Sequence, residues 1–201
     1  MSTYEKFYVQ KNHMKTKRDH IGRMNNNKVE CMKIARQFSY DFWDGDRKFG
    51  YGGHKYIDGY WEDVAKSFIK DYNLNNESKI LDVGCGKGFL LYEITKILPN
   101  IEIYGFDISE YAIKNSKEEI SNKLFVHNAA NKTKFQNNQF DLVFSLATLH
   151  NLNFTPLLNS IKASKSCNAT SSASINASNF VTSSDSCRAS MEASVAPKSY
   201  I

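Results

Sequence analysis

The chain has 201 residues, 41% of them hydrophobic and 23% charged, which is the size and composition of one globular domain and excludes wholesale disorder. It holds no apolar run of ~18 residues and no apolar segment after its first charges, so neither a membrane span nor a secretory leader is expected. The net charge of +5 is concentrated in residues 1–40, where nine basic side chains stand against three acidic ones without a nucleic-acid-binding motif. We therefore expect a cytoplasmic protein with no nucleic-acid or membrane partner. The four cysteines follow no metal-binding spacing, so no metal is expected.

The first sixty residues precede the regular part of the sequence. Apolar residues at helical spacing predict a helix over residues 27–40. Residues 41–60 hold five glycines among many aromatic side chains, a composition that suits neither a helix nor an alternating strand. We expect an ordered loop or lid there. Tyr51, Asp44 and Asp46 either contact a substrate or belong to a lid that packs on the core.

Residues 61–153 alternate helical and strand patterns. The expected elements are helices at 61–72, 89–98 and 110–119, the last capped by Ser109, and strands at 79–83, 101–106, 124–128 and 140–145. Strands that alternate with amphipathic helices form a parallel sheet with helices on both faces, because crossover connections are right-handed. The sequence therefore predicts a doubly wound α/β fold with a mostly parallel sheet.

A glycine-rich turn, DVGCGKG at residues 82–88, joins the first predicted strand to the following helix. Glycines allow positive φ angles and close approach of a ligand to the backbone, and the helix N-terminus offers N–H groups. The spacing discriminates between ligands: a dinucleotide fingerprint would need glycine where Phe89 stands, and a P-loop would need G-K-[ST]. Both NAD and ATP are disfavoured.

An acidic residue, Asp107, ends the next predicted strand 25 residues after Asp82. A carboxylate in that place can accept hydrogen bonds from both hydroxyls of a ribose. Parallel strands end at the same edge of a sheet, so the glycine turn and Asp107 are expected to face one crevice. The pair indicates a nucleoside ligand.

The block Asp82–Gly88, the sequence Gly105–Ser109 with its central Asp107, and the strand FDLVFS at 140–145 resemble the class I S-adenosylmethionine-dependent methyltransferases over residues 60–152. The resemblance implies a Rossmann-like fold with S-adenosyl-L-methionine as cofactor. It also implies a set of cofactor-binding residues at the strand ends: Asp82, Gly84, Cys85, Gly86, Gly88, Asp107, Ile108, Asn128, Ala129 and Ser145.

Within this set the resemblance implies distinct roles. Asp82 and the glycines line the methionine end, Asp107 holds the ribose, and Ile108 flanks the adenine. Asn128 and its neighbour reach the adenine edge, and the end of the fourth strand closes over the sulfonium. His150 is the nominal catalytic base, with a packed or solvated loop histidine as the alternative reading.

The acceptor is expected to be a small molecule. The aromatic and aspartate-rich sequence DFWDGDRKFGYGG resembles a segment that precedes this domain in some bacterial methyltransferases linked to surface-sugar synthesis. That resemblance implies a sugar or polysaccharide precursor as acceptor. Two alternatives stay open: a catalytically silent module that binds the cofactor only, and a nicotinamide oxidoreductase, which Phe89 disfavours.

Composition changes near residue 154. Residues 1–153 contain 8 serines, whereas residues 160–201 contain 13 and show no strand or helix period. We expect the segment 154–201 to be a disordered tail, because it cannot bury enough apolar surface to offset backbone ordering. The fold is then incomplete at its C-terminus, truncated or altered in reading frame, and the strand at 140–145 is left as an uncovered edge.

Overall fold

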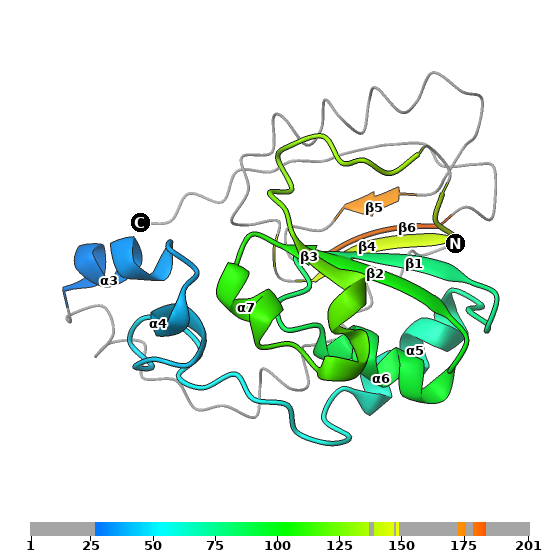
Figure 1. The fold of residues 1–201 in the computed structure, drawn as a ribbon, viewed down its shortest axis with the longest axis horizontal. Helices are drawn as coiled ribbons and strands as arrows, with labels where there is room; N and C mark the ends of the chain where they lie inside the picture. The colour runs from blue at the N-terminus through cyan, green and yellow to red at the C-terminus, as the bar shows by residue number, and fades with distance from the viewer. Residues whose placement is uncertain (1–26, 137–138, 147, 149–172, 176–178, 184–201) are drawn as a thin grey trace.

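The computed structural model describes residues 27–136, 139–146, 148, 173–175 and 179–183. One sheet of six strands organises them, in the order β3-β2-β1-β4-β6-β5 (Figure 1). The strands are β1 Lys79–Val83, β2 Glu102–Asp107, β3 Leu124–Val126, β4 Leu142–Leu146, β5 Ala173–Ile175 and β6 Asn179–Ser183. The first four pair in parallel, while β6 runs antiparallel to β4 and to β5.

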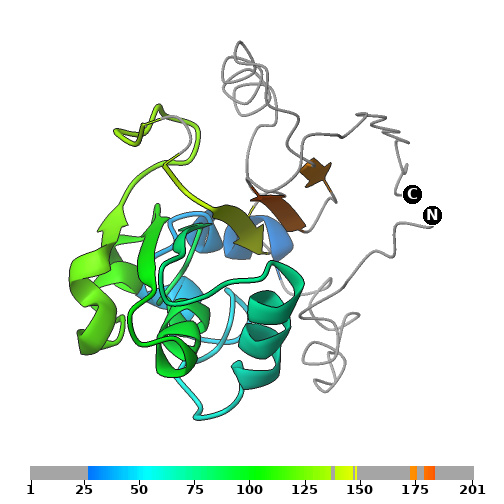
Figure 2. The ribbon, with the colours of Figure 1, turned by 90° about the vertical axis from the view of Figure 1, so that its right-hand side faces the viewer.

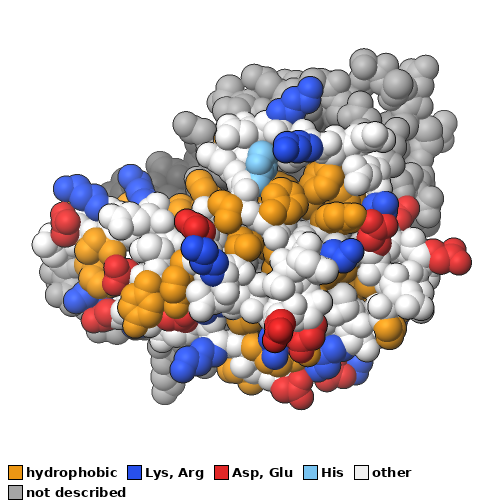
Figure 3. Space-filling model, viewed as in Figure 1, with side chains coloured by type: hydrophobic (Ala, Val, Ile, Leu, Met, Phe, Trp, Pro, Cys, Tyr) orange, Lys and Arg blue, Asp and Glu red, His pale blue; other side chains and the backbone are white. Residues whose placement is uncertain are grey.

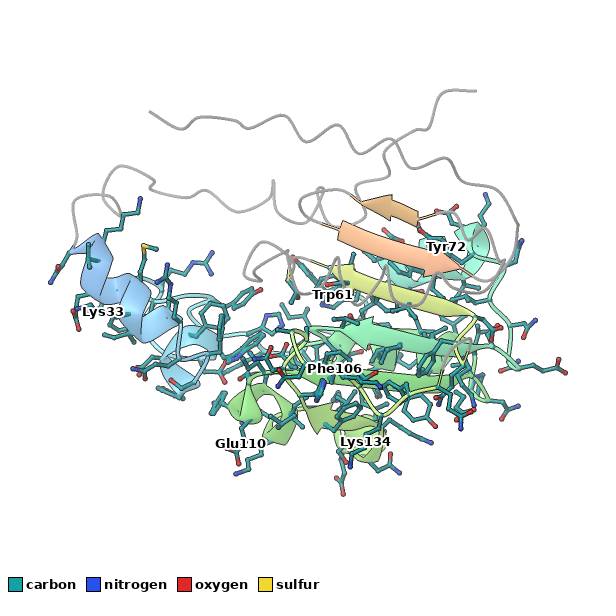
Figure 4. The ribbon with its side chains drawn as sticks, turned by 90° about the horizontal axis from the view of Figure 1, so that it is seen from above. Lys33, Trp61, Tyr72, Phe106, Glu110 and Lys134 are labelled. Atoms are coloured by element: carbon teal, nitrogen blue, oxygen red, sulfur yellow. The ribbon has the colours of Figure 1, made fainter. Side chains whose placement is uncertain are left out.

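The helices lie in two groups. They are α3 Lys28–Ala35, α4 Tyr40–Trp43, α5 Glu62–Asp71, α6 Phe89–Ile97, α7 Glu110–Lys114 and the 3-10 turn η1 Glu118–Lys123. In Figure 1, α5, α6 and α7 lie on one side of the sheet. From above, α3 with Lys33 lies beyond one end of the strands, and Tyr72 marks the other end (Figure 4). The parallel pairing of β1 to β4 and the reversal of strand order at β1 confirm the doubly wound α/β fold with a mostly parallel sheet. Among the described residues, α5, α6 and α7 cover one face of that sheet (Figure 1).

The core lies between the sheet and helices α5 and α6. Ile80, Ile103 and Leu142 occupy equivalent register positions on neighbouring strands, and each is at most 2% exposed. Phe144, two residues further along β4, is fully buried. Phe68 of α5 contacts Phe144 edge to face, with ring centroids 4.9 Å apart. Removing a buried ring of this kind costs about 3–5 kcal/mol, so this layer holds β1 and its glycine turn in place. On the face shown in Figure 3, hydrophobic side chains also reach the surface, and Phe125 of the edge strand β3 is 36% exposed.

Two predicted helices are shorter in the structure. The helix expected at 27–40 ends at Ala35, and Phe38 takes a φ of 48°, which a right-handed helix cannot accommodate. Its apolar stripe is not a core face, since Val29 is 68% exposed. The helix expected at 110–119 begins as predicted, with Ser109 accepting a hydrogen bond from the Ala112 N–H, but ends at Lys114.

The expectation that no strand follows β4 is wrong. β6 pairs with β4 over five residues, from Leu142 with Ser183 to Leu146 with Asn179, so β4 is not an edge (Figure 2). Without a neighbour, β4 would expose a row of unpaired N–H and C=O groups. The segment NFVTS can pair with that row because its aromatic and β-branched residues favour an extended backbone. A change of reading frame near residue 154 stays a prediction. Among the described helices none is long and apolar enough to cross a membrane.

Candidate functional site

The glycine turn between β1 and α6 has the backbone that its sequence requires. Gly84 and Gly86 have φ angles of 81° and 57°, in the left-handed region that favours glycine. The N–H groups of Gly84 and Cys85 donate to the carbonyl of Phe106 at 2.8 and 3.0 Å, which fastens the turn to β2. A Cβ on Gly86 would lie 2.8 Å from the ring of Trp43, so the absence of a side chain lets the tryptophan approach.

Asp107 lies beside this turn at the end of β2. One carboxylate oxygen accepts from the Gly86 N–H at 2.9 Å and the other from the Ser109 N–H at 2.8 Å. Burial raises the pKa of Asp107, and these backbone hydrogen bonds oppose that rise. Each oxygen keeps a lone pair for a further donor, such as a ribose hydroxyl.

Two buried polar atoms at the ends of β1 and β4 have no hydrogen-bond partner among the described residues. They are Oδ1 of Asp82 and Oγ of Ser145, whose residues are 5% and 0% exposed. Burial, and then the charge of Asp107, raise the pKa of Asp82 well above its usual range. A buried polar atom without a partner is costly, so these atoms mark a place where a ligand or its water would complete the bonding.

A pocket opens at the point where the strand order reverses between β1 and β4. Its lining residues are Phe38, Phe42, Trp43, Tyr51, Gly84, Phe106, Asp107, Ile108, His127, Asn128, Ala129, Leu146 and Thr148. Five predicted cofactor residues are therefore brought together: Gly84, Asp107, Ile108, Asn128 and Ala129. Ligands collect in this crevice of open α/β sheets because strand ends and helix N-termini meet there.

Other predicted residues lie near this pocket without lining it: Asp82, Cys85, Gly86, Gly88 and Ser145. Gly88 serves packing, because a Cβ there would lie 2.7 Å from the side chain of Leu124, and its N–H donates to the Cys85 carbonyl at 2.9 Å. The Cys85 thiol is half-buried against the core, and burial raises its pKa. His150 lies outside the described residues.

Residues 38–54 form an aromatic cover over the glycine turn. The Lys87 ammonium, 5% exposed, binds the Asp44 carboxylate at 2.7 Å and the His54 carbonyl at 2.8 Å. Tyr111 donates to the same Asp44 oxygen at 2.7 Å. Burial alone would raise the pKa of Asp44, but these hydrogen bonds outweigh burial, and the pKa falls below its usual value. Asp44 is thus engaged with groups of the protein and is not among the residues that line the pocket. Asp46 is exposed and accepts from the Lys48 N–H.

Sequence reasoning missed several pocket residues. Thr148 follows β4 and His127 follows β3, so their places after strand ends are a signal that could have found them. Leu146, the last residue of β4, belongs to the strand end that was expected to close over the sulfonium. Phe38 and Phe42 had no such signal, because their contact with the crevice depends on how the first sixty residues cross the domain. Asn128 was among the predicted residues. Its side-chain oxygen accepts from the Ala130 N–H at 2.9 Å and keeps a second lone pair, so this oxygen and the amide nitrogen can both address an adenine edge.

Comparison with known proteins agrees with this geometry. The methyltransferase domain family matches residues 74–193. The chain belongs to this family. It is 37% identical over 76 residues to the mitochondrial arginine-hydroxylase NDUFAF5 of Mus musculus, covering 38% of this chain and 22% of that protein. It is 34% identical over 88 residues to demethylmenaquinone methyltransferase of Chlorobaculum tepidum, covering 43% of this chain and 36% of the relative.

Solved structures are similar over half of the chain. A SAM-dependent methyltransferase from Aquifex aeolicus is 25% identical, with a TM-score of 0.41, and the match covers 49% of this chain and 56% of that one. The chain therefore spans well under two thirds of these relatives. The site fits S-adenosylmethionine on its own features: the left-handed glycine turn that brings Gly84 into the pocket lining, the free lone pairs of Asp107, and the nearby unpartnered oxygens of Asp82 and Ser145.

Proposed function

We propose that this chain binds S-adenosylmethionine in the crevice and transfers its methyl group to a small-molecule acceptor of sugar type. The observation that carries the proposal is the meeting of Gly84, Asp107 and Asn128, from the ends of three strands, in one pocket. S-adenosylmethionine supplies a methyl group on a positively charged sulfur. The residues of this chain bind and orient it: Asp107 holds the ribose hydroxyls and the glycine turn receives the methionine end.

Positioning is the main contribution expected of the protein. Methyl transfer is an in-line displacement in which the acceptor–carbon bond forms as the carbon–sulfur bond breaks and its electron pair returns to sulfur. Holding the reacting atoms ~3–3.5 Å apart contributes about 7–11 kcal/mol to such a step. An acceptor hydroxyl must also lose its proton, and His150 stays the predicted base, worth ~10²–10⁴-fold in rate.

The aromatic cover supports a small acceptor. Phe38, Phe42, Trp43 and Tyr51 wall the pocket on the side away from the strand ends. A duplex or a folded protein needs an open surface, whereas an aromatic wall suits the apolar face of a ring. The names of the relatives do not choose an acceptor, since they include a demethylmenaquinone methyltransferase and a ribosomal RNA methyltransferase. The sugar-type acceptor therefore rests on the aromatic wall and the sequence resemblance.

Two measurements test the proposal. Isothermal titration with S-adenosylmethionine, S-adenosylhomocysteine and NAD should show binding of the first two and none of NAD. Release of S-adenosylhomocysteine should then depend on an acceptor from a panel of nucleotide sugars and free sugars, with Asp107→Ala as the inactive control. Binding without release on any acceptor class would favour a silent cofactor-binding module, and binding of NAD alone would overturn the proposal.

A further inference from the structure

The wall of the pocket opposite the strand ends is built on Trp43. Its indole is 6% exposed and stacks on the ring of Tyr51, with centroids 5.1 Å apart and planes 7° from parallel. Phe42 contacts both rings edge to face, at 5.2 and 5.3 Å. All three residues line the pocket. The indole is therefore a rigid part of the site.

The position of the indole is set by two loops that bind different parts of the cofactor. Its six-membered ring lies over Gly86, where an added Cβ would be 2.8 Å away. Its Nε1 donates to the Ser109 hydroxyl at 2.8 Å, two residues after Asp107. Gly86 belongs to the turn assigned to the methionine end, and Asp107 to the ribose. Gly86 and Asp107 are themselves joined by the 2.9 Å hydrogen bond from the Gly86 N–H, and the indole lies beside this junction. The indole lines the pocket together with Gly84 of the same turn and with Asp107, and the sulfur joins the two parts of the cofactor that these residues are assigned to bind.

The charge of the sulfur gives this placement a chemical meaning. The methyl donor carries a sulfonium cation, whereas its product S-adenosylhomocysteine is a neutral thioether. Aromatic faces attract cations, most strongly in desolvated sites and best of all for tryptophan. No lysine or arginine is among the described residues that line the pocket, and the nearby Lys87 is neutralised by Asp44 at 2.7 Å. Nothing on this wall therefore repels a sulfonium.

We propose that the indole of Trp43 lies against the sulfonium of the bound cofactor and favours the charged methyl donor over its neutral product. This inference rests on the proposed function. Ser109 is the positioning residue: it is 2% exposed, its Oγ accepts from the Trp43 Nε1–H and the Ala112 N–H, and it donates to the Phe38 carbonyl. Removal of that hydroxyl leaves the Trp43 Nε1–H with the Phe38 carbonyl, 3.2 Å away, as its acceptor, and so loosens the hold on the indole in the pocket wall.

The test compares affinities for S-adenosylmethionine and S-adenosylhomocysteine by isothermal titration on the full chain. Trp43→Leu should weaken binding of the donor about 3- to 30-fold more than binding of the product. Trp43→Phe should fall between Leu and the native residue, and Ser109→Ala should shift the same ratio in the same direction. Trp61→Phe, at the other tryptophan of the chain, is the matched control and should leave the ratio unchanged.

A second measurement keeps the shape of the ring. In the Trp61→Phe background, incorporation of tryptophans with increasing fluorine content removes negative charge from the indole face without removing the ring. Donor affinity should fall stepwise with fluorine number while product affinity stays constant. Equal loss for both ligands in Trp43→Leu, or donor affinity insensitive to fluorination, would overturn the inference and leave Trp43 as a packing residue. Failure of the native chain to bind either ligand would instead refute the proposed function.

Discussion

Replacement of Asp107 is the sharpest test of the cofactor site. Both carboxylate oxygens accept backbone N–H groups, at 2.8 and 2.9 Å. The side chain therefore has two tasks: it fastens the glycine turn to the end of β2, and it is proposed to bind the ribose. Hydrogen bonds to a charged group contribute about 1.5–3 kcal/mol, so Asp107→Ala should raise the dissociation constant for S-adenosylmethionine roughly 10- to 150-fold. The same variant leaves the Gly86 and Ser109 N–H groups without their partner, and should lower the free energy of unfolding as well.

Asp107→Asn separates the two tasks. An amide group in this place must direct its NH₂ at either the Gly86 or the Ser109 N–H, so one buried donor loses its acceptor at a cost of about 1–3 kcal/mol. The remaining oxygen can still accept one ribose hydroxyl, and affinity should fall less than in the alanine variant. Urea unfolding gives the stability and isothermal titration gives the affinity. Native affinity in a folded Asp107→Ala would refute the ribose assignment.

Three further predictions concern the cover and the turn. Gly86→Val should abolish cofactor binding while far-UV circular dichroism stays close to native, because a φ of 57° and the ring of Trp43 leave no room for a side chain; normal titration would place the cofactor elsewhere. Lys87→Met should lower the free energy of unfolding in urea by about 3 kcal/mol, because Asp44 loses its counter-ion, and the double variant Lys87→Met with Asp44→Asn should recover part of that loss. Additive losses in the double variant would contradict the pairing. Burial, and then the charge of Lys87, lower the pKa of His54 to about 4 in the folded chain. Between pH 6.5 and 4 the unfolded chain therefore binds a proton that the folded chain does not, and the free energy of unfolding falls by up to about 3 kcal/mol as pH is lowered through that window. His54→Gln should flatten this dependence in urea titrations at pH 4 to 7.

The local parts of the fold and site could be read from the sequence. β1 spans Lys79–Val83, the range predicted from its apolar run, and the glycines that follow it adopt the positive φ angles expected of them. Such features depend on neighbours a few residues apart, through strand and helix periods, cap residues and the freedom of glycine. Since parallel strands end at one edge, the meeting of Gly84 with Asp107 also followed from the order of elements.

The tertiary structure alone decided which distant groups share the site. Lys87 pairs with Asp44 across 43 positions, and Trp43 donates to Ser109 across 66. No local period encodes these contacts. A buried ammonium needs an acidic partner and a buried indole N–H needs an acceptor, but the path of residues 38–54 over the turn decides which residue fills each role. The pairing of β6 with β4 is of the same kind, because an open strand edge accepts whichever extended segment the chain brings to it.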